Sequence, residues 1–167
     1  MRILLAIDGS EHSEAAVDEI GRRHFPAESE VRVISVVEPP YSPAMYPGES
    51  GIMNLYAEIE KTAHERAHAA VEKTAAKLRA EEGSHCLNVT TEVLLGLPKQ
   101  VILEQAEAFG ADLIVVGSHG HGLIERFLLG SVSQAVALHA KCSVEIVRRR
   151  APDDEDNNGQ NHTEKED

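Results

Sequence analysis

The stretch Leu113-Ile114-Val115-Val116-Gly117-Ser118-His119-Gly120 runs from an apolar segment into a glycine loop, and Gly130-Ser131-Val132-Ser133 follows after nine intervening residues. An uninterrupted apolar run of this kind is typical of a parallel strand that is covered on both faces. Glycine at the end of a strand allows a positive φ and a close approach of the backbone to a ligand. A Gly-Ser pair at the start of the next helix offers free N–H groups and hydroxyls, which suit a phosphate. The spacing therefore predicts a nucleotide site.

The rest of the chain alternates between short apolar runs and amphipathic segments. Strands are expected at Ile3–Ile7, Val31–Val37, Val89–Leu95, Asp112–Val116 and Ser143–Val147, and helices from Glu11 to about His24, from Leu55 to about Glu82, after Pro98 to Ala108, and from about Ser131 to His139. This alternation implies right-handed crossovers and a parallel sheet with helices on both faces. The first and fourth runs are the most apolar, so we place them side by side at the centre. The expected fold class is α/β, an open doubly wound sheet of five parallel strands in the order 3-2-1-4-5.

Two segments stand outside this alternation. Glu38 to Asn54 carries Pro or Gly at six positions and is expected to be a long loop. Such a loop could close over a ligand or receive a partner, and a passive surface loop explains the composition equally well. The C-terminal end lacks apolar residues, so we expect one domain over residues 1–149 and an acidic, disordered tail over 150–167.

Composition excludes several classes of protein. The formal net charge is −12, and residues 151–167 contribute half of it. The remaining body has 21 acidic and 15 basic residues, which disfavours binding to nucleic acid or to an anionic membrane. Two cysteines, Cys86 and Cys142, are too few for a disulfide framework or a four-cysteine metal site. No signal peptide or membrane-length apolar segment is present, so a soluble cytoplasmic protein is expected.

The predicted topology brings the polar residues of two strand ends together. Ligands of doubly wound sheets bind outside the carboxyl ends of the strands, where the strand order reverses. Asp8 would there lie beside Gly117 and accept hydrogen bonds from ribose hydroxyls, although an aspartate at this point could also be a helix N-cap. Phosphate contacts would come from the N–H groups of Gly120, Ser131 and Val132 and from the Ser131 and Ser133 hydroxyls. Ser131 could cap its helix as well, and the two roles are compatible.

The pattern Gly-x2-Gly-x9-Gly-Ser after an apolar strand resembles the nucleotide-binding signature of the universal stress protein family. The opening Ile3–Ser10, the turn Gly96–Pro98 and the start of the last strand at Cys142–Val144 resemble the family too, in the same order. The resemblance covers about residues 1–149. It implies an ATP-binding, stress-response regulator that forms a homodimer through its last strand, Ser143–Val147.

The resemblance also implies a role for each site residue. It assigns adenine to Ala6, Ile7 and Val36, ribose to Asp8 and Gly117, and the phosphates to Gly120, Gly130, Ser131, Val132 and Ser133. Mg²⁺ would be held mainly by the phosphates, with no catalytic residue and no protein metal ligand. Two alternatives remain: a slow ATPase or phosphotransferase using the same pocket, and a dimeric module that binds no nucleotide. The absence of a Walker lysine and of an evident general base disfavours efficient turnover.

Three features depart from this picture. His119 and His121 lie in the glycine loop, where His121 could add charge near a phosphate or simply face solvent. Glu145 interrupts the last strand, which leaves the details of dimer pairing open, and it could instead protect an exposed edge.

The third feature is His64-Glu65-Arg66-Ala67-His68, which fits the H-E-x-x-H pattern of zinc peptidases. The predicted core stripe of this helix is Ile59, Ala63, Ala67, Ala70, Thr74 and Leu78, which turns His64 and His68 towards solvent. The longer zinc-peptidase pattern also fails, because Val71 and Thr74 occupy its Gly and His positions. A catalytic zinc is therefore not expected, whereas adventitious binding of a transition metal at this pair is more plausible.

Overall fold

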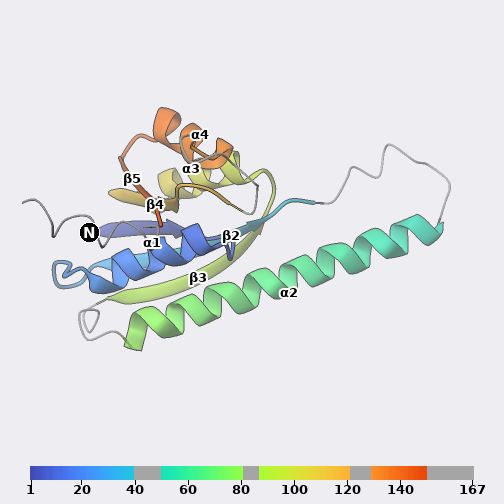
Figure 1. Cartoon of the computed structure of the whole chain (residues 1–167), viewed down its shortest axis with the longest axis horizontal. Coiled ribbons are helices and arrows are strands. Elements are labelled where there is room, and N and C mark those ends of the chain that lie inside the picture. Colours follow the sequence, from blue (N-terminus) through green and yellow to red (C-terminus); the bar gives the residue numbers. More distant parts are fainter. Residues whose placement is uncertain (40–49, 81–86, 121–128, 150–167) are drawn as a thin grey trace, which may run out of the picture.

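The computed structural model of the chain describes residues 1–39, 50–80, 87–120 and 129–149, with the side chains of 50–53 excepted. Its elements are β1 (Arg2–Ala6), α1 (Glu11–Arg22), β2 (Glu30–Val37), α2 (Ser50–Ala80), β3 (Asn88–Leu95), α3 (Pro98–Phe109), β4 (Leu113–Gly117), α4 (Ser131–His139) and β5 (Ser143–Val147). The strands form one sheet in the order β3-β2-β1-β4-β5, and every neighbouring pair is parallel. The predicted fold class and strand order are therefore confirmed (Figure 1). The predicted tail, 150–167, lies outside the described residues.

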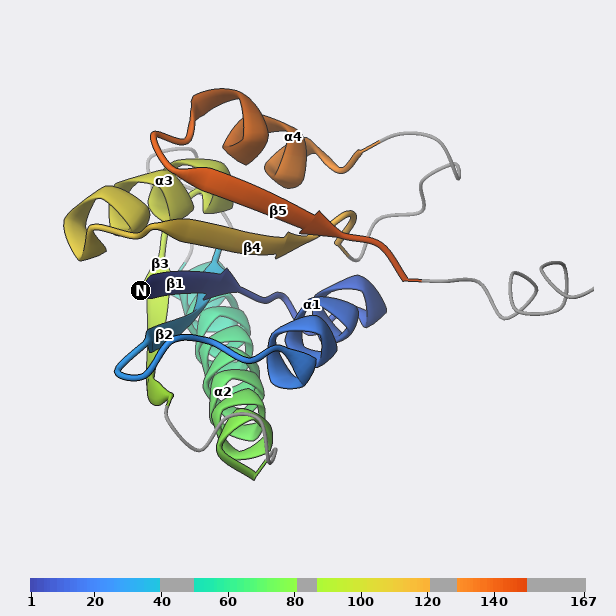
Figure 2. The same ribbon diagram turned by 90° about the vertical axis from the view of Figure 1, so that its left-hand side faces the viewer.

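Two apolar layers enclose the sheet. Helices α1 and α2 cover one face of the sheet, and α3 and α4 cover the other (Figure 2). Ile3 and Leu5 of β1 belong to the core under α1 and α2, and Leu4 belongs to the core under α3 and α4. Successive side chains of a strand point to opposite faces, so a central strand must be apolar at every position. Ile3–Leu5 of β1 and Leu113–Val116 of β4 meet this requirement, and the two strands lie side by side. β3 is an edge strand, which explains its more polar sequence.

The helix α2 begins earlier than the sequence pattern indicated. It starts at Ser50, so the expectation of a loop through Asn54 is wrong for its last five residues. Gly51 led to that expectation, but a single glycine costs a helix only about 1 kcal/mol relative to alanine. A helix of 31 residues accommodates that cost. Residues 40–49, which include most of the prolines of the predicted loop, lie outside the described residues.

The first half of α2 extends past the strands (Figure 1). Ala67, Thr74 and Leu78 of the predicted core stripe are buried, but Ile59 is 45% exposed. The stripe was therefore predicted too long, because the sheet covers only the second half of the helix. Although α2 is long, no helix within the described ranges combines the length and the apolar character that crossing a membrane requires.

An ion pair joins α1 to the edge strand β5. The Nη1 and Nη2 atoms of Arg23 each donate to one oxygen of Glu145, at 2.7 Å, and Nε donates to Glu19. Burial tends to lower the pKa of Arg23, but the hydrogen bonds to the two glutamates raise it above its ordinary value. The charge of Glu145 is thus neutralised within the chain rather than presented bare at the sheet edge.

Removing this ion pair is expected to lower the unfolding free energy by about 1 kcal/mol. The bidentate geometry strengthens the interaction, but both side chains are partly exposed to water, which weakens it. Arg23→Ala and Glu145→Ala, with the double variant, give the coupling between the two side chains in urea denaturation. A coupling of about 0.5 kcal/mol or more is expected. Strictly additive effects would mean that the two side chains act independently.

Candidate functional site

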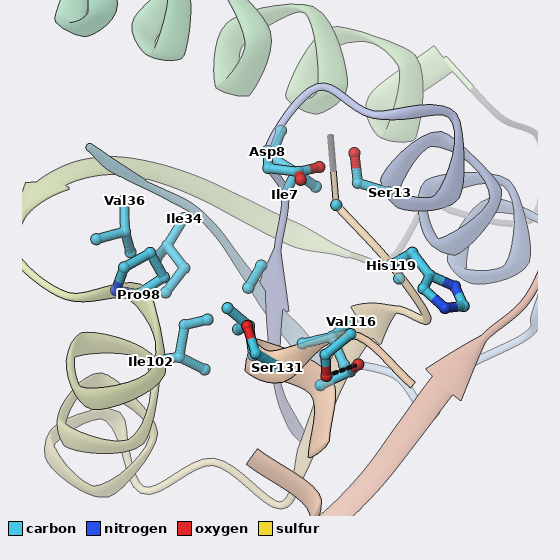
Figure 3. A pocket seen from close by; sticks show the side chains of 16 residues that line it. Ile7, Asp8, Ser13, Ile34, Val36, Pro98, Ile102, Val116, His119 and Ser131 are labelled. Atoms are coloured by element: carbon cyan, nitrogen blue, oxygen red, sulfur yellow. Dashed lines mark hydrogen bonds between the residues drawn. The ribbon is translucent and has the colours of Figure 1, made fainter. Parts of the chain in front are cut away.

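A cavity of about 270 Å³ lies at the carboxyl ends of the central strands (Figure 3). All ten residues named from the sequence line it. They are Ala6, Ile7, Asp8, Val36, Gly117, Gly120, Gly130, Ser131, Val132 and Ser133. They come from the end of β1 and the two residues after it, the end of β2, the end of β4 and the loop after it, and the start of α4. The fold therefore gathers four distant segments of the chain around one hollow.

Six further residues line the cavity and were not predicted: Ser13, Ile34, Pro98, Ile102, Val116 and His119. Ile34 lies two residues before Val36 and therefore points to the same face of β2. Its place in the cavity could have been predicted from this spacing. Pro98 and Ile102 are one turn apart at the start of α3. Pro98 belongs to the Gly96–Pro98 turn named above, but that motif did not indicate that the start of α3 faces the cavity. Figure 3 shows Ile34, Val36, Pro98 and Ile102 grouped on one side, which makes that end of the cavity apolar.

The start of α4 forms a polar wall. Gly130 is the N-cap, with φ −60° and ψ 151°, and no side chain of the described residues caps the helix. Ser131 is the first helical residue, so its alternative role as the N-cap is wrong. Its hydroxyl has no hydrogen-bond partner among the described residues. Uncapped N–H groups and an available hydroxyl make this wall suitable for an anion.

Ser133 has a different part in the same wall. Its side chain is buried, and Oγ lies 2.9 Å from the carbonyl oxygens of both Ser118 and Gly130. The Gly130 N–H also donates to the Ser118 carbonyl, at 2.8 Å. Because the hydroxyl proton is directed to backbone carbonyls, Ser133 holds α4 against the glycine loop.

The three signature glycines are required for close approach rather than for backbone conformation. Positive φ occurs at Gly9, Gly96, Gly110 and Glu28 within the described residues, so none of the three signature glycines uses the positive φ that glycine allows. A Cβ on Gly117 would lie 2.7 Å from the carbonyl carbon of His12. On Gly120 it would lie 2.5 Å from Oδ2 of Asp8, and on Gly130 3.1 Å from the carbonyl oxygen of Ser118. Gly117 therefore serves helix packing, whereas Gly120 leaves room for a carboxylate.

Asp8 stands at the cavity just after β1. Its Oδ1 accepts a hydrogen bond from the Ser10 N–H at 3.0 Å. Ser10 is the N-cap of α1, and its hydroxyl accepts from the Ser13 N–H at 3.2 Å. The reading of Asp8 as the helix cap is therefore wrong. Its exposed carboxylate borders the cavity and can accept further hydrogen bonds.

Behind the glycine loop lies a pair of histidines. The rings of His12 and His119 are 5.1 Å apart, and Ser118 Oγ lies 3.4 Å and 3.1 Å from their respective Nδ1 atoms. Nε2 of His119 is buried and has no hydrogen-bond partner in the described part of the chain. An unpaired N–H costs more than an unpaired lone pair, which favours the tautomer that donates from Nδ1 to Ser118. In Figure 3 the His119 ring points away from the apolar end of the cavity. His121 lies outside the described residues.

Cys142 gives no sign of a reactive site. Burial raises the pKa of its thiol, with a smaller contribution from Asp112, while a backbone hydrogen bond acts in the opposite direction. The thiol is therefore protonated at neutral pH, which argues against a nucleophilic thiolate. Cys86 lies outside the described residues.

Comparison with known proteins identifies the family to which the chain belongs. The model of the "Universal stress protein family" matches residues 1–148. A universal stress protein of Methanocaldococcus jannaschii is 38% identical over 150 residues, which cover 89% of this chain and 82% of that protein.

Solved structures agree in fold. The universal stress protein UspA from Lactobacillus plantarum has a TM-score of 0.72 at 24% identity, covering 89% of this chain and 97% of that one. A family member from Arabidopsis thaliana with AMP bound has a TM-score of 0.60 at 17% identity, covering 92% and 94%. Because the family model and the Methanocaldococcus relative both match over most of its length, the chain belongs to the universal stress protein family.

Proposed function

We propose that the chain binds ATP in this cavity and acts as a nucleotide-dependent regulatory homodimer in a stress response. The observation that carries the proposal is the convergence of an apolar end, a carboxylate and an uncapped helix start on one hollow. The Arabidopsis relative with AMP bound supports an adenine nucleotide as the ligand class.

The lining residues fit the three parts of such a ligand. The base would lie against the apolar end, between Val36 and Pro98, and the ribose hydroxyls would donate to Asp8. The phosphates would meet the N–H groups of Ser131 and Val132, where the helix dipole favours negative charge. Mg²⁺ would be held mainly by the phosphates and would offset their charge.

The edge strand β5 supports the dimer part of the proposal. Val144 and Ile146 are only half-buried, and Arg23 neutralises Glu145, so charge does not prevent pairing of two such edges. The Ser118 N–H donates to the Val147 carbonyl at 2.8 Å, which ties the glycine loop to the end of β5. Nucleotide occupancy could reach the dimer edge through this bond. Sedimentation equilibrium with and without Mg·ATP tests that link: an unchanged dimer dissociation constant would refute it.

The first experiment is to denature the freshly purified protein and identify any released nucleotide, and then to titrate the apo protein with Mg·ATP by calorimetry. Saturable binding of ATP that stays intact for hours supports the regulator. Conversion of the added ATP to ADP would instead favour the slow ATPase. No heat of binding at millimolar ATP would overturn the proposal.

Asp8→Ala is expected to weaken ATP binding by about tenfold to a hundredfold, since hydrogen bonds to a charged group contribute about 1.5–3 kcal/mol. Inorganic triphosphate lacks a ribose, so its affinity should change little. Competition binding with both ligands measures the difference. Asp8→Asn is the matched control, because its amide oxygen can still accept from the Ser10 N–H and preserve the entry to α1. Equal weakening of both ligands by Asp8→Ala would remove the ribose assignment.

A further inference from the structure

We infer that His64 and His68 on α2 form a chelating site for a divalent transition-metal ion of the Ni²⁺, Cu²⁺ and Zn²⁺ class. The two residues are four positions apart within the helix Ser50–Ala80. This spacing places side chains one above the other on the same face, with Cβ atoms about 5–6 Å apart. Two imidazole nitrogens can then reach one ion at the usual distance of about 2.0–2.1 Å.

Both imidazoles are available to a ligand. His64 and His68 are exposed, and neither forms a hydrogen bond, ion pair or ring contact with another described residue. The other described histidine pair, His12 and His119, differs in this respect because its Nδ1 atoms lie against Ser118. Chelation at the α2 pair would therefore displace no existing interaction of the two rings.

The ligand set determines the class of metal. Imidazole nitrogen suits nickel, copper and zinc, whereas Mg²⁺ and Ca²⁺ prefer oxygen ligands. No group of three or more His, Cys, Asp or Glu side chains converges on a metal position within the described ranges. The protein would thus supply two nitrogens and water would complete the coordination, which differs from the three protein ligands of a catalytic zinc site. Glu65 is a neighbour in the sequence, but its carboxylate is 3.9 Å from Lys61 Nζ.

A metal ion bound to His64 and His68 would stabilise α2. His64 and His68 lie between Ile59, which is exposed beyond the sheet, and Val71, which is buried beneath it. An ion that joins two successive turns here would stabilise the helix at the point where sheet support begins. No residue of α2 with a described side chain, 54–80, lines the cavity, so this site is independent of the proposed nucleotide function.

Calorimetric titration of the untagged full-length chain with Ni²⁺ alone tests the site. We expect wild-type binding to weaken by at least about tenfold in His64→Ala and in His68→Ala, because each loses one of two metal–nitrogen bonds. His139→Ala is the matched control: it removes an exposed helical histidine that has no histidine one turn away, and it should leave this binding unchanged.

A spacing variant separates chelation from histidine content. H68A/A69H keeps the number of histidines but moves one ring about 100° around the helix, so it should bind Ni²⁺ as weakly as His68→Ala. Hydrogen exchange of the α2 amides near His64 should slow with Ni²⁺ in the wild type and not in this variant. Wild-type affinity in H68A/A69H, or in His64→Ala, would overturn the inference.

Discussion

Gly130→Val is expected to abolish ATP binding, with a loss of about a hundredfold or more in affinity, while the sheet stays folded. A Cβ at this position would already lie 3.1 Å from the Ser118 carbonyl oxygen and 3.2 Å from His119 Cα. Valine adds two methyl groups at the N-cap of α4, the point where phosphates would approach the free N–H groups. Loss of two charge-assisted hydrogen bonds, at about 1.5–3 kcal/mol each, accounts for the expected magnitude. Calorimetry with Mg·ATP measures it.

Two controls make this result interpretable. Gln134→Ala changes an exposed residue in the next turn of α4 that does not line the cavity, so its ATP affinity should equal that of the wild type. Urea denaturation of Gly130→Val reports whether crowding of the glycine loop has also destabilised the fold. Normal ATP binding by a folded Gly130→Val protein would refute the assignment of phosphates to the start of α4.

The strand order could be predicted because burial leaves a strong mark on a parallel sheet. β1 and β4 are covered on both faces, so every residue from Ile3 to Leu5 and from Ile114 to Val115 is apolar and fully buried. The polar residues of β3 likewise mark an edge strand. The position of the cavity could be predicted as well, because glycine, serine and aspartate follow the central strands and the carboxyl ends of these strands lie at the same edge of the sheet.

What the sequence could not reveal depends on contacts between distant segments. Nothing near Pro98 indicates that the start of α3 closes the apolar end of the cavity. Ile59 continues the apolar period of α2, yet the sheet does not reach it, so periodicity alone overestimates the buried face. Ser133 looks equivalent to Ser131 in the motif, but only the structure shows its hydroxyl directed to two backbone carbonyls.

The glycines of the signature illustrate the same limit, because one motif combines two physical requirements. Gly117 faces the backbone of α1: a Cβ there would lie 2.7 Å from the carbonyl carbon and 2.9 Å from the carbonyl oxygen of His12. Gly120 faces Oδ2 of Asp8, which is the end of a side chain and can rotate away. The motif alone suggests that both glycines serve the ligand. Both line the cavity, but their neighbours show that Gly117 is also needed for packing against α1, whereas Gly120 faces the Asp8 side chain.

Gly117→Ala should therefore lower the unfolding free energy by about 3 kcal/mol, at the upper end of the cost of overpacking, because a backbone segment of α1 must move. Gly120→Ala is the matched substitution: it should change stability by less than about 1 kcal/mol, since only the Asp8 side chain must give way. Its effect should instead be on ATP, because a displaced Asp8 no longer meets the ribose. Urea denaturation and calorimetry on both variants separate the two roles. Equal stability of Gly117→Ala and the wild type would mean that α1 can move without cost. Packing would then not explain why position 117 is glycine, and only a role in ligand binding would remain.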